Sequence, residues 1–253
     1  MKAISLQSGS NGNCVYVEGG GVRLLFDAGI SGRAARERLC DAGRDVGSVD
    51  ALLISHGHSD HIRSAGAFHR MFGLPLHMSA PTGCACEHRL GRVRGVECFA
   101  PGETLDFGAL VVHTIPTPHD ADGGCAFVIE CDGVRLGILT DLGHVFPALP
   151  ELIGSLDAVF LESNYDPEML ASGPYPYSLK QRIRGRGGHI SNVESAALLR
   201  CHAGERLRWA CLAHLSETNN TPELALRSHR AAWADGFPLH VASRYHASDV
   251  LEL

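Results

Sequence analysis

The feature that most constrains the fold is a run of potential metal ligands that directly follows a short apolar stretch. Residues Ala51–Ile54 are all apolar, which is typical of a buried β-strand. They lead into Ser55–His61, where three histidines and one aspartate lie within six residues. Alternation in an extended loop places the His-x-His pair on one side, and the following Asp-His pair can face a second ion. The pattern predicts a metal site at the end of a buried strand.

The types of ligand restrict the metal. Imidazole together with carboxylate suits Zn²⁺, Mn²⁺ or Fe²⁺ better than Mg²⁺ or Ca²⁺, which prefer oxygen ligands. A second ligand pair, Cys84 and Cys86, lacks the two further cysteines that would complete a tetrahedral site. The chain has nine cysteines and no Cys-x-x-Cys pair, so we expect buried thiols in a reducing compartment.

Length and charge exclude several classes of protein. A chain of 253 residues is long enough for a substantial core. Its net charge of −6 argues against a surface built wholly for polyanions, although a local basic strip stays open. No apolar run approaches the roughly 18 to 20 residues of a membrane span, and no apolar signal segment follows Lys2. We therefore expect a soluble, cytoplasmic protein with no membrane partner.

The expected secondary structure begins with strands and continues with strands that helices separate. A β-hairpin is predicted around Gly19-Gly20-Gly21, and a helix from the N-cap residue Ser31 to Gly43. The stretch from Gly173 to Gly188, rich in Gly, Pro and Arg, is expected to be a long loop. Strands are expected at 3–6, 14–18, 22–26, 51–54, 110–115, 126–130, 134–139, 158–161, 209–212 and 239–242, and further helices at 65–72, 193–202 and 222–234.

This order of elements favours an α/β (α+β) fold in which two mixed β-sheets pack face to face with helices outside. A capping box, Ser191-Asn192-Val193-Glu194, marks the start of the helix at 193–202. No linker divides the chain, so a single domain is expected over residues 1–253.

The His-x-His-x-Asp-His run resembles the signature of the metallo-β-lactamase-fold hydrolases. The resemblance implies an αββα sandwich, the metallo-β-lactamase fold, with a dinuclear metal site at the edges of the sheets. It also implies three further ligands, each located after a predicted strand. By this resemblance the first ion is bound by His56, His58 and His119, the second by Asp60, His61 and His214, and Asp141 bridges both.

Such a ligand set implies a particular nucleophile. Each ion would keep one open position, which a bridging hydroxide can fill. Two cations that share one water lower its pKa far below the value in bulk water, which gives a nucleophile at neutral pH. Asp60 is therefore assigned a catalytic role as well as a ligand role. Asp27 resembles the early aspartate that supports the ligand loop in this superfamily.

Two motifs beyond the ligands resemble the nuclease branch of the superfamily. They are Leu161–Asp166, which contains Glu162, and Gly187–Asn192, which contains His189. In that branch a histidine before a helix acts on the phosphate, and a glutamate after a strand positions it. Phosphodiester cleavage needs such a group because the leaving alkoxide must be protonated. His189 and Glu162 are therefore predicted to be catalytic.

A basic segment lies just before His189. Tyr175–Arg186 carries four cationic side chains in an otherwise acidic chain, which suits a nucleic-acid backbone. The Ser8–Asn13 loop has the small residues of an anion-binding nest. The predicted substrate contacts are Ser8, Ser10, Asn11, Lys180, Arg182, Arg184, Asn192 and Asn219.

Together these motifs resemble the YycJ/WalJ-like exonuclease branch, with His144 as a departure after the Asp141 motif. The resemblance implies a dinuclear metal-dependent phosphodiesterase, a 5′ exonuclease on DNA more than on RNA, with Zn²⁺ or Mn²⁺ bound and Fe²⁺ as a further option. The leading alternative is a small-molecule hydrolase of the same fold, a lactonase or thioesterase, which would need neither His189 nor the basic segment. A non-catalytic nucleic-acid-binding protein is disfavoured by the complete ligand set. The oligomeric state stays open.

Overall fold

The computed structural model describes residues 1–232 and 236–253 of the chain. Its strands form two mixed sheets of seven strands each, so the expected class of two mixed sheets with flanking helices is confirmed. The chain divides into two compact units, and a single domain over residues 1–253 stays a prediction. The first unit comprises Met1–Pro116, Ala121–Asp132 and Ser243–Leu253, and the second comprises Thr117–Asp120 and Gly133–Ala242.

The first unit contains the whole of one sheet, with the strand order β14-β1-β2-β3-β4-β5-β6. The first three strands form an antiparallel meander, whereas β3 to β6 run parallel to one another. The predicted strand at 51–54 is β4, which is fully buried in the interior of this sheet. The strands are β1 (Lys2–Gln7), β2 (Cys14–Gly19), β3 (Val22–Phe26), β4 (Ala51–Ile54), β5 (Leu76–Ser79), β6 (Val96–Phe99) and β14 (Leu251–Glu252).

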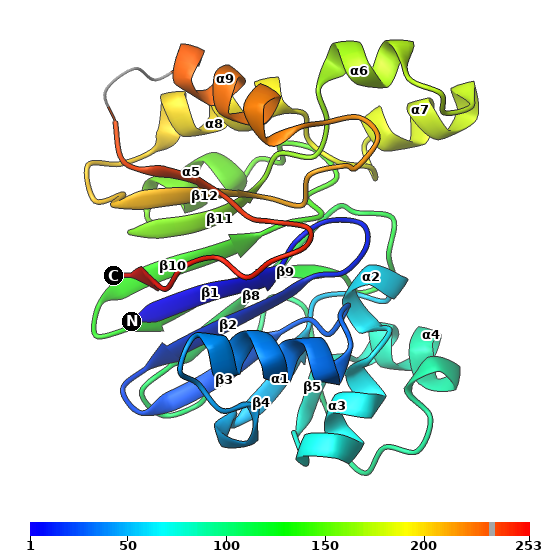
Figure 1. Ribbon diagram of the computed structural model, residues 1–253, viewed down its shortest axis with the longest axis vertical. Helices are drawn as coiled ribbons and strands as arrows, with labels where there is room; N and C mark the ends of the chain where they lie inside the picture. Colours follow the sequence, from blue (N-terminus) through cyan, green and yellow to red (C-terminus); the bar gives the residue numbers. More distant parts are fainter. Residues whose placement is uncertain (233–235) are drawn as a thin grey trace. The chain divides into compact units, whose positions relative to one another are not determined.

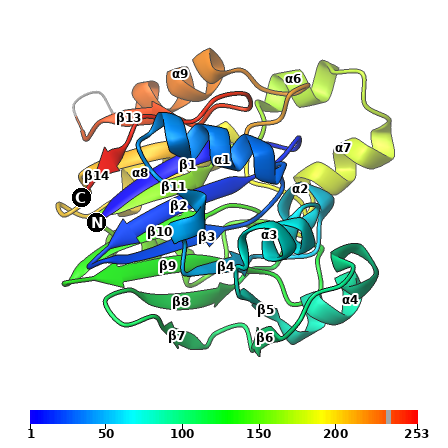
Figure 2. The same ribbon diagram turned by 60° about the horizontal axis from the view of Figure 1, so that its bottom comes forward.

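Helices cover one face of this sheet, and Figures 1 and 2 show α1 and α3 lying across it. Helix α1 begins after Ser31, whose side chain accepts a hydrogen bond from the backbone N–H of Ala34 at 3.1 Å. Ala35 and Leu39 on its inner face join the buried core of the unit. The helices of the unit are α1 (Gly32–Asp41), the 3₁₀ helix η1 (Val46–Ser48), α2 (Ser59–Ile62), α3 (Ala65–Phe72) and α4 (Ala80–Leu90).

A second set of strands in the same unit packs against the sheet. Phe26 of β3 and Phe127 of β9 are both buried, and their ring centroids are 5.0 Å apart. The first unit therefore contains the expected face-to-face packing of strands. This set is antiparallel and consists of β7 (Thr104–Asp106), β8 (Val111–Pro116) and β9 (Cys125–Cys131).

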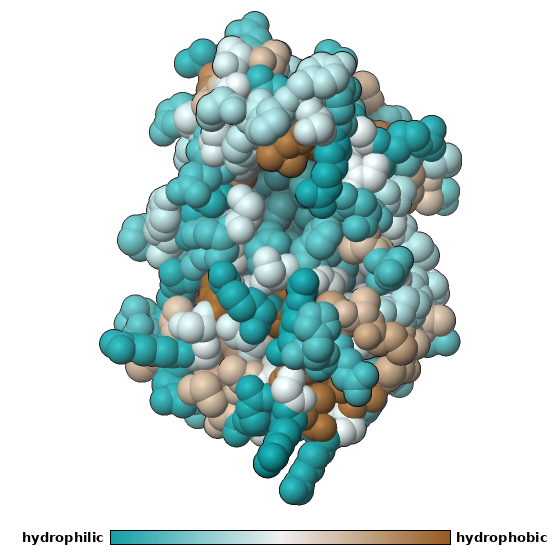
Figure 3. Space-filling model, turned by 90° about the vertical axis from the view of Figure 1, so that its right-hand side faces the viewer, coloured by the Kyte–Doolittle hydropathy of each residue, from teal (hydrophilic) through white to brown (hydrophobic). Residues whose placement is uncertain are grey.

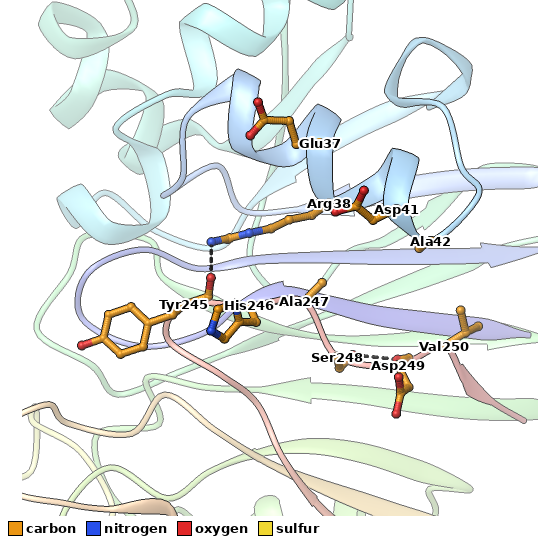
Figure 4. A pocket seen from close by; sticks show the side chains of 10 residues that line it. All are labelled: Glu37, Arg38, Asp41, Ala42, Tyr245, His246, Ala247, Ser248, Asp249 and Val250. Atoms are coloured by element: carbon orange, nitrogen blue, oxygen red, sulfur yellow. Dashed lines mark hydrogen bonds between the residues drawn. The ribbon is translucent and has the colours of Figure 1, made fainter.

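The C-terminal segment of the first unit packs beside α1. Arg38 of α1 donates a hydrogen bond to the backbone carbonyl of Leu6 at 3.0 Å. It also donates to the backbone carbonyl of Tyr245 at 2.7 Å (Figure 4). The segment and the helix line a cavity of about 610 Å³ whose walls include Glu37 and Asp249. After this segment the chain forms β14, which pairs with β1.

The second unit is built on four parallel strands in the order β13-β12-β11-β10. Figure 1 shows α8 and α9 together on one side of these strands. Within the described ranges, no helix combines the length and the apolar character that a membrane crossing needs. The elements are β10 (Val134–Leu139), β11 (Ala158–Glu162), β12 (Trp209–Ala213), β13 (Leu239–Val241), α5 (Leu149–Gly154), α6 (Pro167–Ser172), α7 (Tyr177–Arg184), α8 (Asn192–His202) and α9 (Pro222–Ala232).

Several predicted elements agree with the structure in detail. The bounds of β4, β10 and α3 are those predicted. The capping box at the start of α8 is confirmed, since Ser191 and Glu194 each accept a hydrogen bond from the other's backbone N–H. The helix predicted to end at Ala234 is described as far as Ala232, and its last two predicted residues lie outside the described residues.

The prediction of a long loop from Gly173 to Gly188 is wrong, because this stretch contains the eight-residue helix α7. Glycine and proline flank the segment and suggested a loop. Between them, however, Leu179 and Ile183 are spaced four residues apart, which gives a helix an apolar inner side. Both side chains are half-buried in the structure.

Candidate metal and catalytic site

The first set of predicted ligands lies in the first unit, between the end of β4 and the first turn of α2. His58 is the N-cap residue of α2. His56 and His61 are buried, whereas His58 and Asp60 are partly exposed. The ligand run therefore forms a short loop and one helical turn directly after a buried strand, as predicted.

Asp27, which follows β3, orients two of these histidines. Its Oδ2 lies 2.7 Å from Nδ1 of His61. Its Oδ1 accepts hydrogen bonds from the backbone N–H of Ser55 at 2.8 Å and from the Ser55 hydroxyl at 2.9 Å. The Ser55 Oγ also lies 2.9 Å from Nδ1 of His56. Nδ1 of both rings is thereby engaged, which suits metal ligation through Nε2.

The loops after β1 and β3 pack tightly against the ligand turn. The backbone N–H of Ala28 donates to the carbonyl of His61 at 2.7 Å, and that of Asn13 donates to the carbonyl of Asp60 at 2.8 Å. A Cβ atom at Gly29 would lie 1.6 Å from the Asp60 oxygen, so only glycine fits there. Asn13 Nδ2 also lies 3.0 Å from Nε2 of His61. Asn13 is thus a site residue that sequence reasoning missed, although its loop stood out.

Helix α4 contacts the backbone between His56 and His58. The Arg89 side chain donates to the Gly57 carbonyl at 2.9 Å, and the Cys86 Sγ lies 3.5 Å from the same oxygen. A Cβ atom at position 57 would lie 2.6 Å from that sulfur. Burial raises the pKa of the Cys86 thiol. The close approach of Cys86 therefore requires glycine at position 57, and Cys86 packs against the ligand loop.

The second set of predicted ligands lies in the second unit, where parallel strands end. Asp141 follows β10, Glu162 is the last residue of β11, and His214 follows β12. The carboxyl ends of parallel strands meet at one edge of a sheet, where ligands bind in α/β folds. Asp141 and His214 have φ values of 56° and 55°, and Asp27 in the first unit has a φ of 64°. Non-glycine residues rarely adopt this left-handed conformation, and such strained positions cluster at functional sites.

Asp141 is the centre of a cluster of histidines. Its Oδ1 lies 3.6 Å from Nε2 of His119, 3.6 Å from Nε2 of His214 and 3.6 Å from Nδ1 of His189. Nδ1 of His119 lies 2.9 Å from the Gly188 carbonyl, which fixes the ring and suits ligation through Nε2. The predicted bridging carboxylate therefore lies between a predicted ligand of the first ion and one of the second.

Glu162 connects this cluster to His189. Its Oε1 lies 2.7 Å from Nδ1 of His189, and its Oε2 accepts hydrogen bonds from the backbone N–H groups of Leu142 at 3.1 Å and Ile190 at 3.2 Å. Burial raises the pKa of Glu162, but the charge of His189 and hydrogen bonds from His189 and His214 outweigh this effect and lower the pKa to about 2. Glu162 is therefore ionised at neutral pH, and its carboxylate faces Nδ1 of His189.

The ring of His189 lies between the predicted metal ligands and solvent. Its centroid is 5.0 Å from that of His119 and 5.2 Å from that of His214. Its side chain keeps an exposed fraction of 19%. Because Nδ1 faces Glu162, Nε2 is the atom of His189 that can deliver a proton to a substrate.

Two predicted substrate contacts, Asn192 and Asn219, are fully buried. Asn192 Oδ1 accepts a hydrogen bond from the Ser163 hydroxyl at 2.6 Å, and Asn192 Nδ2 donates to Asn220 Oδ1 at 2.9 Å. The backbone N–H of Asn219 donates to the Ser216 hydroxyl at 3.2 Å. These contacts join the loops after β11 and β12 to the start of α8. The structure thus places both asparagines beneath the surface, in the support of the loops that carry Glu162, His189 and His214.

Two cations of the basic segment are held by other loops of the second unit. Arg182 Nε pairs with Asp120 at 2.6 Å, next to the predicted ligand His119. The hydrogen bond to Asp120 raises the pKa of Arg182. Arg186 Nη2 lies 3.2 Å from Nε2 of His144, and Nδ1 of His144 lies 2.8 Å from the Arg186 carbonyl. Arg182 and Arg186 therefore fix the loops around His119 and His144.

The Ser8–Asn13 loop lies in the first unit. Ser8 is buried and Ser10 is exposed. Asn11 is partly buried, and its Nδ2 donates to the carbonyl of Arg244 at 3.1 Å. Of the three predicted contacts in this loop, Ser10 and Asn11 have surface that a substrate can reach.

The donor atoms fit divalent metal ions. Within the second unit, ligand atoms of Asp141, Glu162, His189 and His214 lie within 4.8 Å of one another. The four ligand candidates of the first unit are likewise imidazoles and one carboxylate, gathered at the end of β4. Nitrogen and carboxylate donors in this proportion suit Zn²⁺, Mn²⁺ and Fe²⁺.

Comparison with known proteins gives the family of the chain. Residues 8–169 match the metallo-beta-lactamase superfamily. The chain is 34% identical to exodeoxyribonuclease YycJ from Bacillus anthracis over 247 residues, which cover 96% of this chain and 94% of that protein. It is 36% identical to exodeoxyribonuclease WalJ from Streptococcus pneumoniae over 224 residues, which cover 87% of this chain and 83% of that protein.

Among solved structures, the metallo-β-lactamase-fold protein YhfI from Bacillus subtilis superimposes with a TM-score of 0.74 and 14% identity, over 98% of each chain. This likeness confirms the predicted metallo-β-lactamase fold. The chain therefore belongs to the metallo-β-lactamase superfamily and, within it, to the branch of YycJ and WalJ.

Proposed function

We propose that this protein is a metal-dependent exodeoxyribonuclease that hydrolyses the phosphodiester bonds of DNA from a 5′ end. The pair of Glu162 and His189, held beside Asp141 and His214, is the observation that carries the proposal. It supplies a proton donor that hydrolysis of a lactone or thioester does not need. The activity named for the YycJ and WalJ relatives supports the same class of reaction.

Membership of the superfamily implies divalent metal ions, and we propose Zn²⁺ or Mn²⁺, with Fe²⁺ as a further option. When bound, two such ions lower the pKa of a water molecule and provide a nucleophile near neutral pH. Asp27 and Ser55 prepare this site by orienting the rings of His56 and His61. The residues that would hold the ions are His56, His58, Asp60 and His61 of the first unit and His119, Asp141 and His214 of the second.

His189 would act at the leaving oxygen of the substrate. As a water oxygen bonds to phosphorus, the bond between phosphorus and the leaving oxygen breaks, and that oxygen needs a proton. Nε2 of His189 supplies the proton, since Nδ1 is held 2.7 Å from Glu162. Through this contact the ionised Glu162 orients the ring of His189 toward the leaving oxygen.

The substrate contacts within our proposal are those that have accessible surface and do not pair with a carboxylate of the protein. Lys180 and Arg184 of α7, and Ser10 and Asn11 in the first unit, would bind backbone phosphates. Arg182, Asn192 and Asn219 would hold the loops of the site. We further propose that the protein acts in the cytoplasm, where DNA is its partner.

The experiment compares wild-type protein with His189→Ala on a DNA oligonucleotide and on bis(p-nitrophenyl) phosphate. We expect His189→Ala to keep its metal content and to lose about 10² to 10⁴ in turnover on DNA, the usual contribution of general acid catalysis. The chromogenic substrate should suffer much less, because nitrophenolate departs without a proton. Strands labelled at the 5′ or the 3′ end report the direction of digestion.

Two outcomes contradict the proposal. DNA cleavage by metal-loaded His189→Ala within a few-fold of wild type refutes the role of His189. Efficient hydrolysis of a lactone or thioester by wild-type protein that leaves DNA intact replaces the nuclease by the small-molecule hydrolase.

A further inference from the structure

Helix α7 lies at the surface, with most of its residues exposed and the others half-buried. None of its eight residues, all of them within the described part of the chain, is buried. Tyr177, its first residue, is 75% exposed. A helix this short is not stable by itself in water, so contacts with its neighbours must hold it in place. Figures 1 and 2 show α7 at the margin of the second unit, in the same region as α6.

The spacing of residues puts an aromatic ring and two cations on one side of α7. Lys180 and Arg184 follow Tyr177 by three and seven positions, so the three side chains share a helix face. Leu179 and Ile183 lie on an adjacent side of the helix and are half-buried, as is Lys180 at the boundary between the two sides. The side formed by Tyr177, Lys180 and Arg184 is called the α7 outer face.

The two cations of the α7 outer face keep their charge available for an anion. Lys180 Nζ donates to the carbonyl of Ala171 at 2.7 Å, and Arg184 Nε donates to the carbonyl of Lys180 at 3.3 Å. Both acceptors are neutral, in contrast to the carboxylate of Asp120 that pairs with Arg182. The upper part of Figure 3 shows hydrophilic and weakly polar surface around one hydrophobic patch. The α7 outer face is therefore a cationic surface with one large exposed ring.

Helix α7 leads directly to the proposed proton donor. The backbone N–H of His189 donates to the carbonyl of Ile183 at 2.8 Å, so the last turn of α7 adjoins His189. The seven positions from Tyr177 to Arg184 correspond to about 10 Å of helix. That length matches about three stacked nucleotides at about 3.4 Å each. A strand whose end reaches His189 can thus run along α7 and bring a base to Tyr177.

We propose that the α7 outer face binds an unpaired DNA strand, with one base stacked on the ring of Tyr177 and phosphates near Lys180 and Arg184. The proposal rests on the nuclease function proposed above and names single-stranded DNA as the form of substrate. Base stacking on an aromatic ring is tolerant of sequence, and cations follow the backbone beside it. A base within a duplex has both faces covered, so Tyr177 selects unpaired strands.

The first test measures binding of a fluorescently labelled ten-nucleotide thymidine strand by anisotropy, in metal-loaded protein with His189→Ala to slow cleavage. Adding Tyr177→Ala should weaken binding by about fivefold or more, the range seen for loss of one stacked base. Tyr177→Phe and Tyr177→Trp should bind as tightly as the parent, since both keep an aromatic face. Met71→Ala, which truncates a 52% exposed side chain on α3, is the matched control.

The second test moves a single abasic nucleotide along the strand. With Tyr177 present, binding should weaken most when the abasic position is about three nucleotides from the end that reaches His189. With Tyr177→Ala, this maximum should disappear, because the missing base then has no ring to stack on. Such a result links one base of the strand to one side chain of the protein.

The inference is overturned if Tyr177→Ala binds like the parent, or if the abasic profile is flat in both proteins. It is also overturned if polyglutamate displaces the strand equally well from the parent and from Tyr177→Ala. That result would show that the surface binds anions through charge alone. Failure of the nuclease function gives a different result, since wild-type protein would then cleave no DNA at all. Cleavage of DNA with no effect at Tyr177 rejects only the stacking surface.

Discussion

Glu162→Gln removes one negative charge from the interior of the second unit and leaves the shape of the side chain nearly unchanged. The pKa of Glu162 is about 2 instead of the ordinary 4.5, because the charge of His189 and its hydrogen bonds more than offset burial. This difference corresponds to about 3 kcal/mol. The substitution also removes the carboxylate oxygen that lies 2.7 Å from Nδ1 of His189 and orients its ring. We expect turnover on DNA to fall by about 10- to 100-fold, less than for His189→Ala.

Single-turnover kinetics on DNA and on bis(p-nitrophenyl) phosphate, with metal content measured, test this expectation. The loss should fall mainly on DNA, whose alkoxide needs the proton. The double variant Glu162→Gln/His189→Ala should be no slower than His189→Ala alone, because both substitutions act through one proton. Glu168→Gln, which removes an exposed carboxylate from α6, is the matched control and should cleave DNA at the wild-type rate.

Equal losses on the two substrates with full metal content would refute the reasoning, because they would show that Glu162 supports the structure of the site instead of the proton on His189. Multiplicative losses in the double variant would refute it as well. A lowered melting temperature of Glu162→Gln, measured without substrate, separates a folding defect from a chemical one.

Three further predictions concern metal, charge and acid. Asp141→Asn should lose metal and turnover. Circular dichroism should show a retained fold, since a core of this size does not depend on its ions. More than a few per cent of activity with full metal content would contradict the ligand assignment. Replacement of Lys180 and Arg184 together by Gln should reduce the salt dependence of single-stranded DNA binding by a slope of about 1.4, whereas Arg182→Gln, whose partner is Asp120, should leave that slope unchanged. Because its pKa is lowered, the contribution of Glu162 to stability is complete above about pH 4.5 and is lost as the pH falls toward 2. In this pH window the free energy of unfolding, measured with urea, should therefore fall more steeply for wild type than for Glu162→Gln.

Much of the candidate site could be predicted because its side chains lie where strands end. Apolar runs such as Ala51–Ile54 are short and bounded by polar residues, so strand ends can be read directly. A ligand that follows a parallel strand is then placed at a known edge of a sheet, as Asp141 and His214 are. The role of Asp27, which follows β3, was predicted from the family resemblance.

The contacts that hold these side chains were not predictable, because each joins residues far apart in the sequence. Nothing in the local sequence indicates that Cys86 of α4 packs against Gly57 of the ligand loop. From the sequence, Arg182 was predicted to contact a substrate phosphate, but its side chain pairs with Asp120, 62 positions earlier. Local composition also gave a wrong prediction at α7, because the flanking glycine and proline residues indicated a loop. The segment is a helix that tertiary contacts stabilise.

The left-handed backbone at Asp27, Asp141 and His214 affects which substitutions evolution favours at these positions. Each such non-glycine residue costs about 1 to 3 kcal/mol, a cost that glycine avoids. A descendant freed from catalysis would gain stability by substitution of glycine at these three positions. An Asp, Asp and His set in a homologous sequence is therefore a signature of a lineage still under selection for chemistry.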